Sequence, residues 1–379
     1  MSFGVDDSTQ SRPLKVAVLC NLDGFANSGK PLLIEEVLSQ RGHTVTVLDT
    51  SFLSRASDKR PLRVFPSPAP TRLKLYLAGA LAHILERFPR RLAGTLTAAL
   101  YVRQMRLRGA ILAREMARIS PDVVVCETQM DSGVMLMDLG RIKKIYNCAT
   151  PLAEELYFGG NLSDKGYERL RAYELSTYEA ADYLSFHWHC YAEYVRKHYQ
   201  YSVDNIFTFD RNAVISKTLA GYSEEPRVVY LGYLGGYWID PELLSQLTKM
   251  YPRIDVYGLP RPPRRLGLNY RGYATREVLQ NYQFGLITCT KDRLRREGFS
   301  AKHVDYLAAG LPVLVPEWRT ATQDLRGTVT YSADDFLDQL REYSKEEIWN
   351  VLSKEALEQA EELSAEKVSA QFISIVEGD

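Results

Sequence analysis

At 379 residues the chain is longer than one ordinary domain, so its length favours two domains of about 150 to 200 residues with a cleft between them. Apolar residues make up 45% and charged residues 25%, a balance that argues against a disordered or membrane-spanning protein. Lysine plus arginine and aspartate plus glutamate both number 47, so the overall charge gives no reason to expect a nucleic-acid partner.

The beginning of the chain predicts a cytoplasmic protein. Residues Met1 to Pro13 are polar, and the first apolar run, Val16 to Cys20, is too short for a signal-sequence core or a membrane-spanning helix. The cysteines are odd in number and scattered, which favours reduced core thiols over disulfides (Cys20, Cys126, Cys148, Cys190 and Cys289).

The first half of the chain alternates predicted strands with predicted helices. A β-branched run at Lys15–Cys20 precedes a polar loop, a helix over Leu32–Gln40 that ends at Gly42, and a strand over His43–Leu48. Two further strands are expected later (Val123–Cys126 and Lys144–Cys148). This alternation indicates an α/β fold with a parallel sheet of the nucleotide-binding kind.

One segment of this half, from Thr71 to Arg118, is strongly basic. Its ten lysines and arginines stand against Glu86 and Glu115, and leucines recur among them at helical spacing. A basic amphipathic helix of this kind is typical of proteins that lie on an anionic membrane surface. The alternative is a helix that packs on the sheet and exposes a basic face to water. The sequence leaves both interpretations open.

The same alternation begins again in the second half. Four strands are predicted there (Arg227–Gly232, Ile254–Gly258, Phe284–Cys289 and Pro312–Val315). Three helices separate them (Pro241–Met250, Arg276–Asn281 and Ala301–Ala309). Tyr199 to Glu225 loses periodicity and gains turn-forming residues, so we predict that it connects the halves. Lys345 to Val376 is predicted as helix.

The most informative stretch lies between two predicted strands of the second half. Glu297 and Asp305 are eight residues apart, so a loop that ends at Glu297 and a helix that contains Asp305 bring both carboxylates to one ligand. Carboxylates accept hydrogen bonds from sugar and ribose hydroxyls. The amides of Phe299 to Ala301, with Ser300 as helix cap and Lys302 as a nearby positive charge, suit a diphosphate.

This stretch resembles the E-x7-E motif of the retaining family 4 glycosyltransferases, which have the two-domain GT-B fold. Asp305 stands in place of the second glutamate. Small and turn-forming residues follow at the family's spacing (Ala308, Gly310 and Pro312). The resemblance implies that Asp305 binds the ribose hydroxyls of a nucleotide, that Glu297 binds hydroxyls of the donor sugar, and that the amides after Gly298 contact the phosphates.

The resemblance also implies the domain organisation. Ser364 to Val368, with Phe372, is similar to the closing helix of such enzymes. The expected fold is therefore two Rossmann-like domains with parallel sheets and a C-terminal helix that crosses back to the N-terminal domain. Residues 1–205 are expected to bind the acceptor, residues 206–345 to bind the nucleotide-sugar, and residues 346–379 to form the crossing helix.

The loop after the first strand of the second domain departs from that family. Tyr230 to Pro241 contains no lysine or arginine, whereas many members have a basic pair there. It resembles instead the loop of bacterial polysaccharide glucuronosyltransferases, which invert and which also carry a lysine three residues before the ribose contact, as Lys302 precedes Asp305. We expect Gly235 and Gly236 to contact the donor, and the stereochemistry stays open.

The two stereochemical outcomes need different catalytic residues. In a retaining reaction the protein mainly supplies positive charge and orientation, and Lys302 is the first candidate, ahead of three residues before it (Lys291, Arg293 and Arg295). In an inverting reaction a carboxylate or histidine of the first domain takes the acceptor's proton. Asp23 and Glu127 each end a predicted strand, where ligands gather in α/β sheets, and Asp131 and Glu154 follow as candidates.

We therefore predict a metal-independent glycosyltransferase of the hexosyltransferase type, cytoplasmic or peripheral on the cytoplasmic face of a membrane. Its donor is expected to be a UDP-, GDP- or dTDP-sugar, and its acceptor a lipid-linked sugar or a small molecule, as in polysaccharide, glycolipid or natural-product glycosylation. No plausible loop carries an Asp-x-Asp pair, and His187 and His189 are spaced poorly for one metal. One alternative is a non-catalytic GT-B-like binding protein; a sugar-nucleotide epimerase is disfavoured because its paired acids and histidine are not found.

Overall fold

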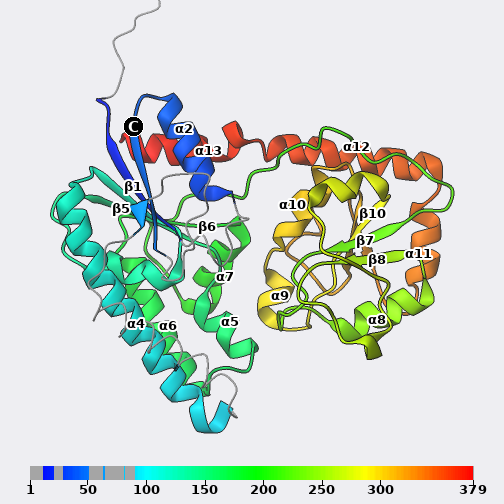
Figure 1. Cartoon of the computed structure of the whole chain (residues 1–379), viewed down its shortest axis with the longest axis horizontal. Coiled ribbons are helices and arrows are strands. Elements are labelled where there is room, and N and C mark those ends of the chain that lie inside the picture. The colour runs from blue at the N-terminus through cyan, green and yellow to red at the C-terminus, as the bar shows by residue number, and fades with distance from the viewer. Residues whose placement is uncertain (1–11, 21–28, 51–62, 65–80, 82–89, 379) are drawn as a thin grey trace, which may run out of the picture.

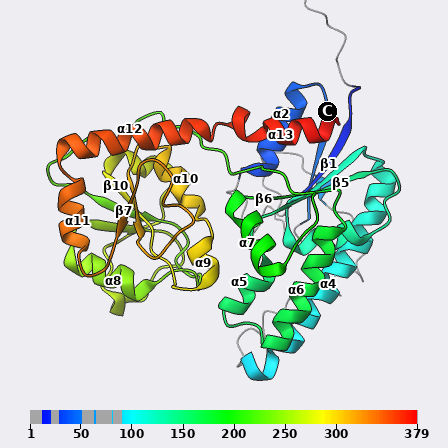
Figure 2. The same cartoon turned by 180° about the vertical axis from the view of Figure 1, so that it is seen from behind.

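The computed structural model describes residues 12–20, 29–50, 63–64, 81 and 90–378. It shows two parallel sheets, each covered by helices, and a pair of C-terminal helices that spans both (Figure 1). Figure 2 shows the same arrangement from behind. The predicted α/β fold with two Rossmann-like units is thus confirmed.

The first sheet has six parallel strands in the order β3-β2-β1-β4-β5-β6, the doubly wound order of nucleotide-binding folds. The strands are β1 Lys15–Cys20, β2 Thr44–Asp49, β3 Arg63–Val64, β4 Val123–Cys126, β5 Lys143–Cys148 and β6 Tyr183–Phe186. The helices are α2 Lys30–Gln40, α4 Arg90–Ile119, the 3₁₀ helix η2 Gln129–Leu136, α5 Leu152–Phe158, α6 Asp164–Glu179 and α7 His189–Tyr199. The central strands β1 and β4 are buried on both faces, which explains their unbroken apolar runs.

The second sheet repeats this topology in the order β12-β11-β10-β7-β8-β9. Its strands are β7 Val228–Leu231, β8 Ile254–Tyr257, β9 Tyr270–Gly272, β10 Phe284–Leu286, β11 Val313–Pro316 and β12 Thr328–Tyr331. Its helices are α8 Pro241–Met250, η3 Arg264–Leu266, η4 Arg276–Asn281, α9 Arg293–Glu297, α10 Ala301–Leu307 and α11 Phe336–Tyr343. The segment predicted as a helix at Arg276–Asn281 is a 3₁₀ helix, because so few residues rarely sustain an α-helix.

The C-terminal segment forms two helices, α12 Glu346–Glu362 and α13 Ala365–Glu377, where we predicted one. They are separated at Ser364, whose hydroxyl accepts from the amide of Lys367 and caps α13. Helix α12 packs on α10 of the second unit, and α13 packs on α2 of the first. Phe372 stacks on Phe209 with ring centroids 4.5 Å apart. The predicted crossing back to the N-terminal domain is confirmed.

Only part of the basic segment falls within the described residues, as α4 and the single residue Leu81. Helix α4 packs tightly on η2, because Gly109 lies so close to Gly133 that a Cβ on either would meet backbone atoms of the other element. Its inner face also buries Arg108, whose guanidinium lies 2.6 Å from a carboxylate oxygen of Asp131. Four other arginines of this helix are exposed (Arg103, Arg106, Arg114 and Arg118). Whether this face meets a membrane stays a prediction.

Candidate functional site

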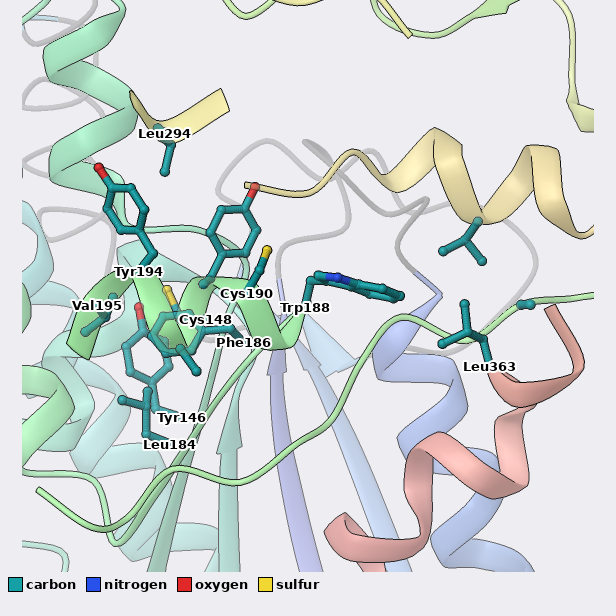
Figure 3. Packing of buried hydrophobic residues seen from close by; sticks show 14 of the residues in the cluster. Tyr146, Cys148, Leu184, Phe186, Trp188, Cys190, Tyr194, Val195, Leu294 and Leu363 are labelled. Atoms are coloured by element: carbon teal, nitrogen blue, oxygen red, sulfur yellow. The ribbon is translucent and has the colours of Figure 1, made fainter. Parts of the chain in front are cut away.

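The predicted donor segment lies where the two units meet. It connects α9 to α10, and α9 packs against α5 and α7 of the first unit (Figure 1). The Phe299 ring stacks on the indole of Trp188 with centroids 3.8 Å apart, and the hydroxyl of Tyr191 donates to the Phe299 carbonyl at 3.0 Å. Figure 3 shows Trp188 close to Cys190 at the start of α7, with Tyr194 farther along the helix. Phe299 is therefore held against the first unit by aromatic and polar contacts.

The two predicted donor carboxylates both pair with basic residues across this interface. Glu297 lies 3.1 Å from the ammonium of Lys197 and 3.0 Å from Nε2 of His198, both on α7. Burial raises the pKa of Glu297, but the hydrogen bonds from His198 and Lys197 outweigh it and leave that pKa below its ordinary value. Asp305 lies 3.3 Å from a guanidinium nitrogen of Arg211, in the segment that connects the two sheets.

The structure corrects two local expectations for this segment. Glu297 is the last residue of the short helix α9 and does not end a loop, and α9 also carries Arg293 and Arg295. Ser300 occupies the N-cap position of α10, but its side chain makes no capping hydrogen bond. The amides of Gly298, Phe299 and Ser300 donate to no hydrogen bond within the described part of the chain. They are available to a ligand.

A partly buried lysine and a buried arginine lie close to this segment. Lys302 donates a hydrogen bond of 2.9 Å to the Tyr230 hydroxyl at the end of β7. Its pKa is lowered to about 8, mainly by burial and in part by the charges of Arg319 and Arg295. Arg319 follows β11 and is 1% exposed. Its guanidinium donates to the carbonyls of Arg295 and Gly298, at 3.2 and 2.6 Å, while Nη1 has no partner.

Within the described part of the chain, these two cations lack a close carboxylate partner. Arg295 forms an ion pair of 2.6 Å with Glu155, but within the described residues neither Lys302 nor Arg319 has a carboxylate at ion-pair distance. A buried charge without a counter-charge is costly. The arrangement therefore favours an anion next to the Gly298–Ser300 amides. Arg319 was not predicted from the sequence, because it belongs to no motif.

In the glycine-bearing loop after β7, Gly232 lies next to Lys302, whereas we expected Gly235 and Gly236 to contact the donor. Gly232 borders Lys302, since a Cβ there would lie 2.8 Å from the lysine Cε. Gly235 lies against the side chain of Tyr233, and Gly236 lies against that of Trp238. Lys302 thus brings a positive charge to the loop that has none in its sequence, and a donor contact by Gly235 and Gly236 stays a prediction.

The first unit presents Glu127 at the end of β4, next to the switch point between β1 and β4. Its Oε1 accepts a 2.9 Å hydrogen bond from Asn147, and its Oε2 lies 3.6 Å from Nε2 of His187. The other first-unit candidates differ. Asp23 lies outside the described residues. Asp131 and Glu154 are fully buried and already bind several donors, including Arg108 and Arg293 respectively, so they anchor structure.

A metal site was not expected at His187 and His189. His189 pairs with Asp210 at 3.0 Å, whereas His187 faces Glu127. The described residues contain no group of three or more His, Cys, Asp or Glu side chains suited to a metal ion. Metal independence itself stays a prediction.

Solved structures with a similar fold identify the architecture of the chain. No protein-family model and no curated protein sequence matches the chain. Among solved structures it is similar to a sucrose-phosphate synthase from Thermosynechococcus elongatus, with 12% identity, a TM-score of 0.63, and coverage of 96% of this chain and 98% of that one. It is also similar to the lipopolysaccharide outer core galactosyltransferase WaaB, with 14% identity, a TM-score of 0.61, and coverage of 96% and 99%.

A third similar structure contains a nucleotide. TarM of S. aureus, in complex with UDP, α-GlcNAc-glycerol and fondaparinux, shares 14% identity at a TM-score of 0.56. The match covers 71% of this chain, and the chain spans 58% of the length of TarM. At identities this low, the structural similarity establishes a shared fold and nothing more. The chain therefore has the GT-B fold of these glycosyltransferases.

Proposed function

We propose that this chain is a glycosyltransferase that moves a sugar from a nucleotide-sugar donor to an acceptor hydroxyl. The observation that carries the proposal is a pair of cations, the partly buried Lys302 and the buried Arg319, which have no carboxylate partner among the described residues and lie in the same region as Glu297 and Asp305 at the interface of a GT-B fold. A donor diphosphate supplies the negative charge that these cations lack.

The carboxylates fit the two sugars of such a donor. The side chains of Glu297 and Asp305 are 22% and 26% exposed, so each can accept further hydrogen bonds besides those from its basic partners. A carboxylate offers about four lone-pair sites. Asp305 is proposed to bind the ribose hydroxyls and Glu297 the hydroxyls of the transferred hexose.

The cations fit the leaving group. Negative charge builds up on the diphosphate as the bond to the sugar breaks, and positive groups in a partly dehydrated site stabilise that charge strongly. Lys302 is proposed to contact the diphosphate directly. Arg319 holds the carbonyl of Gly298, which leaves the amides of the same segment for the phosphates. No metal is required in this scheme, and we expect EDTA to leave transfer unchanged.

The acceptor is proposed to bind the first unit. The exposed arginines of α4 favour a lipid-linked sugar on the cytoplasmic face of a membrane, as in polysaccharide or glycolipid assembly. A small natural product is the second acceptor class. No described helix is both long and apolar enough to cross a membrane, so the proposed attachment is peripheral.

Donor binding tests the proposal. We expect UDP, GDP or dTDP, or one of their sugar conjugates, to raise the melting temperature, because a ligand at 100 times its Kd adds about 2.7 kcal/mol to the free energy of unfolding. Asp305→Asn is expected to weaken nucleotide binding about tenfold or more while the fold is kept. Lys345→Met is the matched control, since Lys345 is exposed and pairs only with Glu342 in the described structure.

The outcomes separate the alternatives. Absence of binding by every nucleotide, or unchanged affinity in Asp305→Asn, contradicts the donor site. Binding of a nucleotide-sugar without transfer to any acceptor and without hydrolysis favours a non-catalytic GT-B-like binding protein.

A further inference from the structure

Two unpaired polar atoms face each other in the first unit. Oε2 of Glu127 and Nε2 of His187 are both buried, lie 3.6 Å apart, and form no hydrogen bond with any described residue. Glu127 follows β4 and His187 follows β6, at the carboxyl edge of the sheet where α/β folds bind their ligands. Buried polar atoms rarely stay unpaired without a functional reason.

The carboxylate is held in a fixed place. Oε1 of Glu127 accepts from Asn147 at 2.9 Å, and Asn147 accepts from Ser185 at 2.8 Å. These residues stand on or next to three neighbouring strands, β4, β5 and β6. Because the Glu127 side chain is only 2% exposed, its buried oxygen is poorly placed to meet an acceptor directly.

His187 is better placed for that contact. Its side chain is 21% exposed although Nε2 is buried. Nδ1 is not among the buried atoms without partners and makes no hydrogen bond within the described residues, so it is the ring nitrogen that can reach a ligand. The next residue, Trp188, stacks on Phe299 of the donor segment, which puts His187 next to the proposed donor.

We propose that His187 is the general base of an inverting glycosyl transfer and that Glu127 is its positioning residue; this rests on the proposed function. Nδ1 of His187 takes the proton of the acceptor hydroxyl, and the acceptor oxygen forms a bond to the anomeric carbon. The bond from that carbon to the phosphate oxygen breaks, and its electron pair leaves with the nucleoside diphosphate. Glu127 stabilises the imidazolium that forms and fixes the ring.

Other charged groups surround this pair. Lys30 on α2 lies within electrostatic reach of Glu127, Asp210 and Arg211, and its ammonium donates to the carbonyls of Phe209 and Asp210. The Arg211 amide donates to the His187 carbonyl at 3.0 Å. Across the start of α7, Asp210 pairs with His189. Variants of His187 and Glu127 must therefore be compared at several pH values.

The experiment uses the full chain with water as acceptor. UDP-glucose, UDP-N-acetylglucosamine, UDP-glucuronate and GDP-mannose serve as donor probes, and released nucleoside diphosphate and the anomer of the released sugar are followed. We expect wild-type protein to release the inverted anomer. His187→Ala is expected to lose about 10²- to 10⁴-fold in rate and to regain donor consumption with azide, an anion that needs no deprotonation, giving the inverted glycosyl azide.

Glu127→Gln separates positioning from folding. We expect it to keep donor affinity and to lower the hydrolysis rate, and to add no further loss of rate to His187→Ala in the double variant, because Glu127 acts only through the His187 ring. His189→Ala, two residues away and half exposed, is the matched histidine control and is expected to behave as wild type.

The outcomes test the role of His187, the role of Glu127 and the proposed function separately. Retention of configuration, an unchanged rate in His187→Ala, or a loss that azide does not restore while donor affinity is intact overturns the assignment of His187 and leaves the proposed function standing. An unchanged rate in Glu127→Gln, or a further loss of rate when Glu127→Gln is added to His187→Ala, overturns the role of Glu127. Failure of wild-type protein to bind any of the four donors and any of UDP, GDP and dTDP overturns the proposed function, and the inference with it.

Discussion

Donor affinity should depend on pH through Lys302. Burial holds the pKa of this lysine at about 8, so its side chain is about 90% charged at pH 7 and about 10% charged at pH 9. A diphosphate binds the charged form. If the bound anion keeps Lys302 protonated throughout, UDP affinity falls about tenfold between these pH values, since the protein must first take up the proton.

Isothermal titration calorimetry in buffers of different ionisation enthalpy measures this proton directly. We expect uptake of about one proton per UDP at pH 9 and of about 0.1 at pH 7. Lys302→Met removes the titrating group and is expected to bind UDP about 10- to 100-fold more weakly at pH 7, with much less dependence on pH. Lys345→Met is expected to match wild type.

The unliganded protein has the opposite dependence. Because the folded-state pKa of Lys302 is lowered, the unfolded chain binds this proton more tightly than the folded chain does. The contribution of Lys302 to the free energy of unfolding therefore rises with pH from about 8 towards the ordinary lysine value of 10.5. The role of Lys302 is refuted if Lys302→Met keeps the wild-type pH dependence of UDP binding, or if wild type takes up no proton at pH 9.

Three further outcomes follow from the structure. Gly327→Ala is expected to lower the free energy of unfolding by about 1 to 3 kcal/mol in urea denaturation, because Gly327 has a φ of +72° and a Cβ there would lie 2.6 Å from the backbone of Ala356 on α12; an unchanged midpoint contradicts that packing. Hydrogen bonds from Arg41 and His43 outweigh burial and hold the pKa of Glu377 below its ordinary value. This stabilisation of about 1 kcal/mol is present above the unfolded-state pKa of Glu377 and is lost as pH falls through its folded-state pKa. Wild type should therefore lose more stability than Glu377→Gln on acidification. Equal losses would contradict the contact of Glu377 with Arg41 and His43. Transfer activity is expected to survive dialysis against EDTA, and a loss restored by a divalent cation would show a metal requirement.

Much of the fold could be predicted because it depends on local patterns. The β-branched runs at Lys15–Cys20 and Val123–Cys126 are central strands, and Gly42, with a φ of +85°, directly follows the last turn of α2 as its sequence position indicated. The spacing of Glu297 and Asp305 also marked the segment that now lies at the interface between the units.

The rest depends on contacts between distant parts of the chain. Arg319 gains its role from burial under the Gly298 carbonyl, and no periodicity reveals that burial. Glu127 and His187 are separated by many residues and meet only because β4, β5 and β6 are neighbours in the sheet. The break at Ser364 follows from the two surfaces that α12 and α13 cover, which the helical composition of the segment does not distinguish.

The crossing of α13 has a consequence for biosynthesis. Phe372 and Val376 belong to the same buried cluster as Val16, Val18 and Phe209 of the first unit. The first unit therefore emerges from the ribosome with part of its apolar core uncovered, and that core closes only after the whole second unit and α13 have been made. We expect the nascent first half to depend on chaperones during this interval, and the two halves to complete folding together.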